Sequence, residues 1–223
     1  MKMIDLSTEL RDNMPKPPSA PVVEMRYVLM HSAQEEAIKG YTNKMEQFTI
    51  TTHVATHIDA PSHFCMDGKN IDEYPVDFFY MVPTLMLDIE RDVYGEICKT
   101  DIREAEEKWG EIRPGDMVIL NTGSFHRYEE EDYNKSPYLT EDGAQYLADK
   151  QVSMVAIDSF TVDDPRKKEK PAHVILLCRY GIPVIECVVN LDQVPEHRFK
   201  TICMPLKVKE GSGAYTRMVA VLD

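Results

Sequence analysis

The sequence lacks any uninterrupted apolar stretch approaching the roughly 18 residues that a membrane-spanning helix requires. Its opening segment, MKMIDLSTELRDNMPKPP, is broken by charged residues and proline before the apolar core of a signal peptide could form. These absences argue against a membrane span and a secretory leader. We therefore expect a soluble, cytoplasmic protein that has no membrane partner.

Positive charge is scarce in this chain. Its 25 lysine and arginine residues stand against 38 aspartate and glutamate residues, which gives a formal net charge of −13. Such a charge repels phosphate backbones, and no basic stripe overrides it, so we expect no nucleic-acid partner. The densest charge runs, EEEDYNK at 129–135 and DDPRKKEKP at 163–171, are expected to be solvated loops.

Cysteine pairs of the CxxC type are absent, and the number of cysteines is odd, which argues against a disulfide framework and against a cysteine-rich zinc site. We expect reduced thiols, most of them packed in the interior: Cys65, Cys98, Cys178, Cys187 and Cys203. Cys65 lies two residues from His63, so a Cys/His nucleophile is an alternative to packing there. Ser124 lacks the GxSxG turn that would expose a nucleophilic serine.

A glycine-rich phosphate loop is also missing. The segment GSGAY at 211–215 has no helix after it, so it predicts a turn before a last strand and not a dinucleotide site. The chain has 223 residues, of which 43% are hydrophobic, enough for one globular unit with a substantial core.

Runs of β-branched and other apolar residues between turn formers predict seven strands, near 22–30, 46–52, 83–89, 116–121, 152–158, 183–189 and 201–208. Helices are predicted at 100–112, with Asp101 as its N-cap, at 139–150, with Thr140 as its cap, and at 171–181. From about residue 100 onward, helices and strands alternate, which favours an α/β sheet with parallel pairs.

The histidines that are present gather in THVATHIDAPSHF at 52–64. A regular helix cannot bring His53, His57 and Asp59 to one point, and a straight strand would spread the cluster too far for one ion. A strand that ends in a compact turn, with Pro61 preventing a helix, would bring them together. Imidazole and carboxylate form a ligand set that suits zinc, manganese or iron. The alternative is that these histidines only cap turns.

Two residues downstream extend this prediction. His173 opens the third predicted helix, and Glu186 lies within the otherwise apolar strand IPVIECVV. A buried, unpaired carboxylate is costly, and a metal ion would remove that cost. His173 as an ordinary helix-start residue and Glu186 as a side chain pointing to solvent are the alternatives.

The segment HVATHIDAPSHF resembles the HxGTHxDxPxHF signature of the cyclase family of metal-dependent hydrolases, which includes bacterial kynurenine formamidases and isatin hydrolases. Weaker resemblance runs along the chain through MIDLSTELRDNMP, AIDSFTVDDP and PLKVKEGSGAYTRMVAVLD. The resemblance implies a swivelling β/β/α-type α/β fold with a mixed sheet, formed by a single domain over residues 1–223. It also implies a homo-oligomer, either a dimer or a tetramer.

Residue by residue, the resemblance implies that His53, His57 and Asp59 bind one divalent metal and that His173 binds a second. Asp59 and Glu186 would bridge the two ions, with zinc expected and manganese as the alternative. His63 matches the position of the proton donor and acceptor.

The chain departs from the family pattern at two places. Ala55 replaces the signature glycine. The resemblance also implies a tryptophan that lines the substrate pocket from the N-terminal loop, as in kynurenine formamidases, but NMPKPPSAPVV has none, and the one tryptophan is Trp109 on a predicted helix. The first departure adds a methyl group beside the ligands. The second leaves the metal chemistry intact and the substrate open.

The favoured function is hydrolysis of a carbon–nitrogen bond in a small amide, either an aryl formamide such as N-formylkynurenine or a cyclic amide such as isatin. Divalent ions lower the pKa of bound water and polarise carbonyls, and a histidine can protonate the departing nitrogen. The same residues would serve a metal-dependent lactonase, or a cyclase or isomerase acting on a small carbonyl compound. A non-catalytic protein that only binds a metal or ligand is the remaining alternative.

Overall fold

The computed structural model describes residues 1–18, 20–29 and 44–222. Its centre is a nine-stranded mixed sheet in the order β1-β13-β11-β5-β7-β9-β10-β4-β12. The nine strands are β1 (Lys2–Asp5), β4 (His57–Asp59), β5 (Val82–Asp88), β7 (Met117–Asn121), β9 (Met154–Ile157), β10 (Val184–Glu186), β11 (Arg198–Ile202), β12 (Gly213–Tyr215) and β13 (Val219–Leu222). The mixed α/β fold expected from the sequence is confirmed.

Four central strands, β5, β7, β9 and β10, run parallel to one another, and antiparallel strands continue the sheet on both sides. The central strands are mostly apolar because both faces of this part of the sheet are largely buried. In β7, Val118 and Leu120 pack with the helices, whereas Met117 and Ile119 pack in a second apolar cluster on the other face. The alternation of helix and strand predicted from about residue 100 is confirmed.

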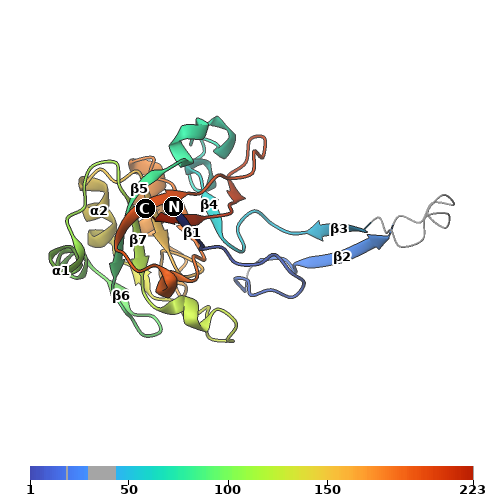
Figure 1. The fold of residues 1–223 in the computed structure, drawn as a ribbon, viewed down its shortest axis with the longest axis horizontal. Coiled ribbons are helices and arrows are strands. Elements are labelled where there is room, and N and C mark those ends of the chain that lie inside the picture. The colour runs from blue at the N-terminus through green and yellow to red at the C-terminus, as the bar shows by residue number, and fades with distance from the viewer. Residues whose placement is uncertain (19, 30–43, 223) are drawn as a thin grey trace.

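The helices cover one face of the sheet (Figure 1). They are α1 (Lys99–Trp109), α2 (Glu141–Asp149) and the short α3 (Pro171–His173), which continues as a π-helix over Val174–Arg179. Two short strands, β6 (Glu96–Ile97) and β8 (Tyr138–Leu139), form a parallel pair just before α1 and α2. Short 3-10 helices lie at Pro61–His63, Ile71–Glu73, Val76–Phe79, Ser124–Arg127 and Leu191–Gln193.

Helix caps were predicted with mixed success. Thr140 caps α2 as expected, since its hydroxyl accepts a hydrogen bond from Gly143 N. The prediction of Asp101 as the cap of α1 is wrong: Cys98 is the cap, and the Asp101 carboxylate accepts from Cys98 N at 2.7 Å. The acid lies one turn inside the helix because it serves as the acidic partner of the capping arrangement.

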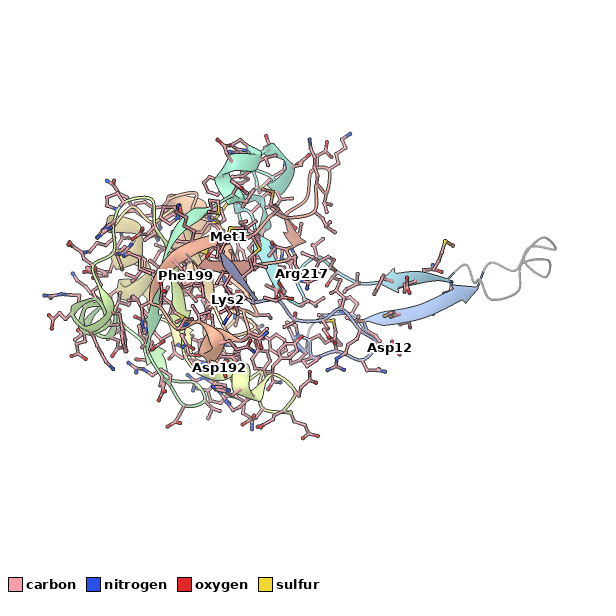
Figure 2. The ribbon with its side chains drawn as sticks, in the orientation of Figure 1. Met1, Lys2, Asp12, Asp192, Phe199 and Arg217 are labelled. Atoms are coloured by element: carbon pink, nitrogen blue, oxygen red, sulfur yellow. A yellow bond between two sulfur atoms is a disulfide. The ribbon has the colours of Figure 1, made fainter. Side chains whose placement is uncertain are left out.

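A two-stranded hairpin of β2 (Glu24–Leu29) and β3 (Lys44–Thr49) extends away from the large sheet (Figure 1). Asp12 lies at its base, where its carboxylate accepts a hydrogen bond from Met25 N at 3.1 Å (Figure 2). The predicted strands at 22–30 and 46–52 correspond to this hairpin, although residue 30 lies outside the described residues. None of the described helices is long and apolar enough to cross a membrane.

The two charge runs predicted as solvated loops are partly buried, so that prediction is wrong in part. Tyr133 is buried and donates a hydrogen bond to the carbonyl of Asp158. Asp163 and Asp164 are also buried. The charge-rich composition of these segments predicted exposure. Individual acids in them can nevertheless be buried, because hydrogen-bond donors that converge on a carboxylate offset the cost of burying it.

Candidate metal centre

Strand β4 presents two predicted ligands on one face. His57 and Asp59 are two residues apart and point to the same side of the sheet, while Ile58 points to the apolar cluster on the other side. Both polar side chains are buried. The expected compact turn spans residues 52–56 and brings His53 beside them, with its Nδ1 2.7 Å from Asp59 Oδ1.

Strand pairing adds Glu186 to this cluster. In the antiparallel register of β10 with β4, Glu186 lies directly opposite His57, and its Oε2 is 3.7 Å from His57 Nε2. Its Oε1 accepts a hydrogen bond from Val162 N at 3.0 Å. Glu186 is therefore a buried residue in the interior of the sheet, not an edge residue pointing to solvent.

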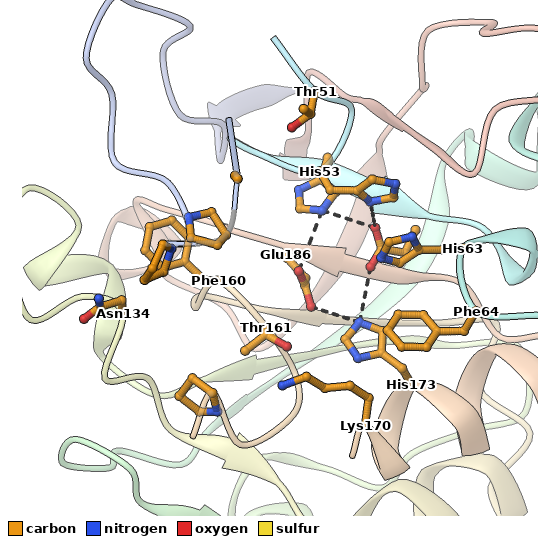
Figure 3. A pocket seen from close by; sticks show the side chains of 16 residues that line it. Thr51, His53, His63, Phe64, Asn134, Phe160, Thr161, Lys170, His173 and Glu186 are labelled. Carbon is orange, nitrogen blue, oxygen red and sulfur yellow. Dashed lines mark hydrogen bonds and ion pairs between the residues drawn. The ribbon is translucent and has the colours of Figure 1, made fainter. Parts of the chain in front are cut away.

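His173 completes the cluster from the helix layer. Its Nε2 lies 3.3 Å from Asp59 Oδ2 and 3.3 Å from Glu186 Oε1 (Figure 3). Asp59 thus directs one oxygen to His53 and His57 and the other to His173. All five predicted ligands converge, in two overlapping groups: His53, His57 and Asp59, and Asp59, His173 and Glu186.

The electrostatics of the cluster are dominated by its two buried acids. Burial and the charge of Asp59 raise the pKa of Glu186. Burial by itself would lower the pKa of His57, but Asp59 and Glu186 raise it to about 9. Burial also opposes protonation of His173, yet Asp163, Asp59 and Glu186 raise its pKa well above the usual range. The carboxylates therefore draw positive charge into the site.

The donor set fits a divalent cation. His57 Nδ1 is fixed by the Ala55 carbonyl at 2.8 Å, so Nε2 faces the acids, 3.2 Å from Asp59 Oδ1 and 3.7 Å from Glu186 Oε2. No described residue makes a well-formed hydrogen bond to this buried atom, and a buried nitrogen held only by such ion-pair contacts favours a further partner. A cation ligated by imidazole nitrogen and carboxylate oxygen would satisfy this atom and balance both acids.

Other residues hold these ligands in place, and sequence reasoning missed them. Asp163, placed in a charge run, accepts hydrogen bonds from His173 Nδ1 at 2.5 Å and from the backbone N–H groups of Ala172 and His173. Ser212 Oγ lies 2.9 Å from His53 Nε2. A side chain at Gly213 would meet His53 Cε1 at 2.7 Å, so the GSG turn leaves room for the ring. The one sequence feature that could have pointed to this positioning role is that Asp163 precedes His173 by ten residues.

His63 lies beside the ligands without contacting the carboxylates. Its ring stacks on His53 with centroids 3.7 Å apart, and it follows β4 in the 3-10 helix Pro61–His63. Burial, which outweighs the nearby charge of Asp59, lowers its pKa to about 4. Its ring nitrogens have no hydrogen-bond partner among the described residues, so they are free to contact a ligand.

A pocket of about 350 Å³ opens over these residues (Figure 3). Besides the five predicted ligands and His63, its described lining consists of Pro17, Pro18, Ala20, Thr51, Phe64, Asn134, Phe160, Thr161, Pro165 and Lys170. The Phe64 ring stacks on His173 with centroids 4.5 Å apart. The five predicted ligands, His53, His57, Asp59, His173 and Glu186, form what we call the metal-type cluster. This cluster therefore lines a pocket suited to a small, partly apolar molecule.

Comparison with known proteins places the chain in a family. The model of the Cyclase family matches residues 4–164. The chain belongs to the Cyclase family. It is 30% identical to a kynurenine formamidase of Bacillus cereus over 97% of this chain and 95% of that protein. It is 28% identical to a kynurenine formamidase of Bacillus anthracis over 98% and 96% of the two chains.

Two solved isatin hydrolase structures resemble the fold of the chain. Isatin hydrolase A from Labrenzia aggregata superposes with a TM-score of 0.84 and 25% identity over 98% of this chain and 93% of that one. The isatin hydrolase A from Ralstonia solanacearum, at 20% identity and a TM-score of 0.85, shares the fold. The resemblance to this family expected from the sequence is confirmed.

The residue that the sequence comparison singled out before β4, Ala55, has an unusual backbone conformation. Ala55 has a φ of 58°, in the left-handed region that glycine adopts without strain. The alanine methyl is buried with Met14, Val23 and Val54. Relief of about 1 kcal/mol of strain by glycine would be offset by loss of a buried methyl, about 0.8 kcal/mol. Alanine is therefore tolerated at this position.

The cysteines differ from the sequence expectation. Cys65 and Cys178, 113 residues apart, form a disulfide with a Cα–Cα distance of 5.6 Å, whereas Cys98, Cys187 and Cys203 are free. The prediction of five reduced thiols is thus wrong for one pair. Sequence spacing could not reveal it, because the fold brings together the turn after His63 and the π-helix after His173. The bond also removes the Cys65 thiol as a nucleophile.

We predict that Asp163→Asn weakens binding of zinc by about 10- to 100-fold, since it disturbs the hydrogen bond that orients His173. Competition with a chromophoric chelator measures this affinity. Asp164→Asn is the matched control, because the neighbouring buried acid pairs with Arg166 and not with His173. Equal zinc affinity in the Asp163 variant and the wild type would contradict the positioning role.

The disulfide is expected to stabilise the fold, because it closes a long loop and restricts the unfolded chain. Cys178→Ser should lower the free energy of unfolding by about 2–4 kcal/mol, measured by urea denaturation. Thiol titration of the unreduced, denatured wild type should find three free thiols. Reductant should destabilise the wild type and leave the variant unchanged. Five titratable thiols would show that the bond does not form.

Proposed function

We propose that this protein is a metal-dependent hydrolase that cleaves the carbon–nitrogen bond of a small amide, either an aryl formamide or a cyclic amide. The observation that carries the proposal is the convergence of three histidines and two carboxylates in the lining of the pocket, with the buried His57 Nε2 facing both acids and making no well-formed hydrogen bond among the described residues. The kynurenine formamidase and isatin hydrolase relatives support the two substrate classes.

The ligand roles follow from the two overlapping groups. His53, His57 and Asp59 would hold one ion, and His173 would hold a second, with Asp59 and Glu186 between them. Zinc suits this nitrogen and oxygen set, and manganese is the alternative. When bound, such ions supply Lewis acidity that activates water and polarises the scissile carbonyl.

His63 is proposed as the proton carrier. Cleavage adds the elements of water across the C–N bond, which breaks: the carbonyl carbon gains a hydroxyl group, and the departing nitrogen gains the other proton of the water. The imidazole of His63 lines the pocket beside the ligands and can accept the proton from water and donate it to that nitrogen. Phe64 and Phe160 give the pocket apolar surfaces against which the organic part of an amide can pack.

The decisive experiment compares His63→Asn with His57→Ala. His63→Asn should retain bound metal and lose about 10²- to 10⁴-fold in kcat, as expected when a general acid–base group is removed. His57→Ala should lose metal and activity together. Metal content is measured by mass spectrometry, and activity on a formanilide, isatin and a simple lactone.

If the protein cleaves the lactone faster than the amides, the proposed function changes from amide hydrolase to lactonase. Undiminished kcat in His63→Asn would refute the role of that histidine. A purified protein that holds no metal and gains no activity with added zinc or manganese would refute the proposal as a whole.

We further propose that the protein is a homo-oligomer, a dimer or tetramer, and that the β2–β3 hairpin contacts a second copy. A lone two-stranded hairpin is marginally stable in water, and this one extends from the body (Figure 1) with Met45 and Phe48 exposed. Burial against another copy would stabilise it.

The double variant Met45→Ser/Phe48→Ser is expected to shift the protein to a smaller species in light scattering coupled to size exclusion. Met66→Ser, which alters a fully exposed methionine elsewhere, is the control. A monomeric wild type, or an unchanged mass in the double variant, would contradict the assignment of this surface.

A cytoplasmic location is also proposed, because three of the five cysteines are free thiols. In that compartment, the glutathione and thioredoxin systems act on exposed disulfides. Cys178 is exposed, so the Cys65–Cys178 bond is open to them.

A further inference from the structure

Lys170 gives the pocket a positive charge that the metal-type cluster does not use. Of the described residues that line the pocket, it is the one lysine or arginine. Its side chain is half-buried and passes beside His173, with the ammonium end directed toward Thr161 (Figure 3). The positive charge therefore lies on the Thr161 side of His173 (Figure 3).

The ammonium group has hydrogen-bonding capacity to spare. It donates one hydrogen bond, to the backbone carbonyl of Asp164 at 3.0 Å, and an ammonium has three donors. No carboxylate within the described part of the chain forms an ion pair with it. The Asp164 carboxylate is turned away, toward Arg166 at 2.8 Å and Lys167 at 3.8 Å.

The acids of the pocket do not balance this charge either. Asp59 and Glu186 contact His53, His57 and His173, and neither lies within ion-pair distance of Lys170. A partly desolvated cation without a carboxylate partner favours an anionic ligand. In a protein of net charge −13, the overall field repels anions, so a local cation has a marked effect on which ligands enter.

The remaining lining restricts what the anion is attached to. Phe160, Phe64 and the Pro17–Pro18 pair provide apolar surface, and Asn134 and Thr161 provide neutral polar groups. A volume of about 350 Å³ accommodates one substituted aromatic ring. A ligand with its amide at the metal-type cluster would carry its anionic group away from the scissile bond, toward Lys170.

We propose that Lys170 is a specificity-determining residue that binds the carboxylate of the substrate, so that the preferred substrates are aromatic amides carrying a carboxylate remote from the scissile bond. The inference rests on the proposed amide hydrolase function for the identity of the reacting group. It does not rest on that function for the binding of the anion.

The test compares formanilide with its 2-, 3- and 4-carboxylated derivatives. The measured quantity is the ratio of kcat/KM for the best carboxylated substrate to kcat/KM for formanilide. Lys170→Met, which keeps the aliphatic stem, should lower this ratio about 10- to 100-fold, mainly through a higher KM, because it removes a charge-assisted hydrogen bond. Lys170→Arg should retain most of the ratio, since the cation is kept.

Lys167→Met is the matched control, because this neighbouring lysine is exposed and does not line the pocket. An equal ratio in Lys170→Met and the wild type overturns the inference, and this includes the case in which both substrates lose activity together. A ratio lowered equally by Lys167→Met also overturns it, since the effect would then be that of the general surface field.

Binding of the aminobenzoate products to the metal-loaded protein separates this inference from the proposed function. Calorimetry should show affinity about tenfold or more lower in Lys170→Met than in the wild type, whether or not any formamide is cleaved. Absence of cleavage with this loss of affinity refutes the hydrolase and supports the anion site. Equal affinities, or no binding by the wild type, overturn the anion site.

Discussion

Two carboxylates, those of Asp59 and Glu186, are buried side by side in the protein, and the arrangement around them follows from that constraint. Buried acids need positive partners or many donors. The fold supplies imidazoles from three separate segments: the turn after β3, strand β4, and the α3 helix. Each imidazole alone would be disfavoured as a buried cation, and each acid alone as a buried anion. The charges of the cluster therefore depend on one another, and its donor groups could hold a divalent ion.

The backbone accommodates this cluster at some cost. Ala55 and Cys187, which lie close to His57 and Glu186 in sequence, both have φ near 58°. Such conformations persist where surrounding contacts fix them. Here Thr56 Oγ1 donates to the carbonyl of Cys187 at 2.7 Å, which ties the two strained segments together. The ligand-bearing strands are thus held by hydrogen bonds between the very turns that permit their geometry.

Much of this site could be predicted from the sequence because its residues are crowded. His53, His57 and Asp59 fall within seven residues. A compact turn that brings three such side chains together is typical of a site that binds one metal ion. Glu186 could be inferred because a carboxylate among apolar strand residues requires a partner. The alternation of helices and strands after residue 100 could also be predicted, because the spacing of apolar residues along each segment indicates whether it is a helix or a strand.

The features that were missed depend on contacts between distant residues. Asp163 was concealed in a run of charges whose average is polar, although its own side chain is buried. Cys65 and Cys178 meet only once the sheet has formed. The cap of α1 is a local exception: Cys98 and not Asp101 is the N-cap, and both residues suit the same short sequence. For Asp163 and the disulfide, the deciding contact depends on the tertiary fold and not on local residue patterns.

The segment after His173 meets two demands that an ordinary helix would meet less easily. Its first turn must hold His173 over the carboxylates, fixed by Asp163, while the following turns must bury Ile175, Leu176 and Leu177 against α2 and the sheet. A π-helix over Val174–Arg179 changes the rotation per residue, so that these faces need not follow the α-helical period. Because the disulfide at Cys178 joins the same segment to the turn after His63, the ligand from the helix layer and the proposed proton carrier are held by one covalent connection. The precision of the site thus comes from cross-links between layers and not from any single rigid element.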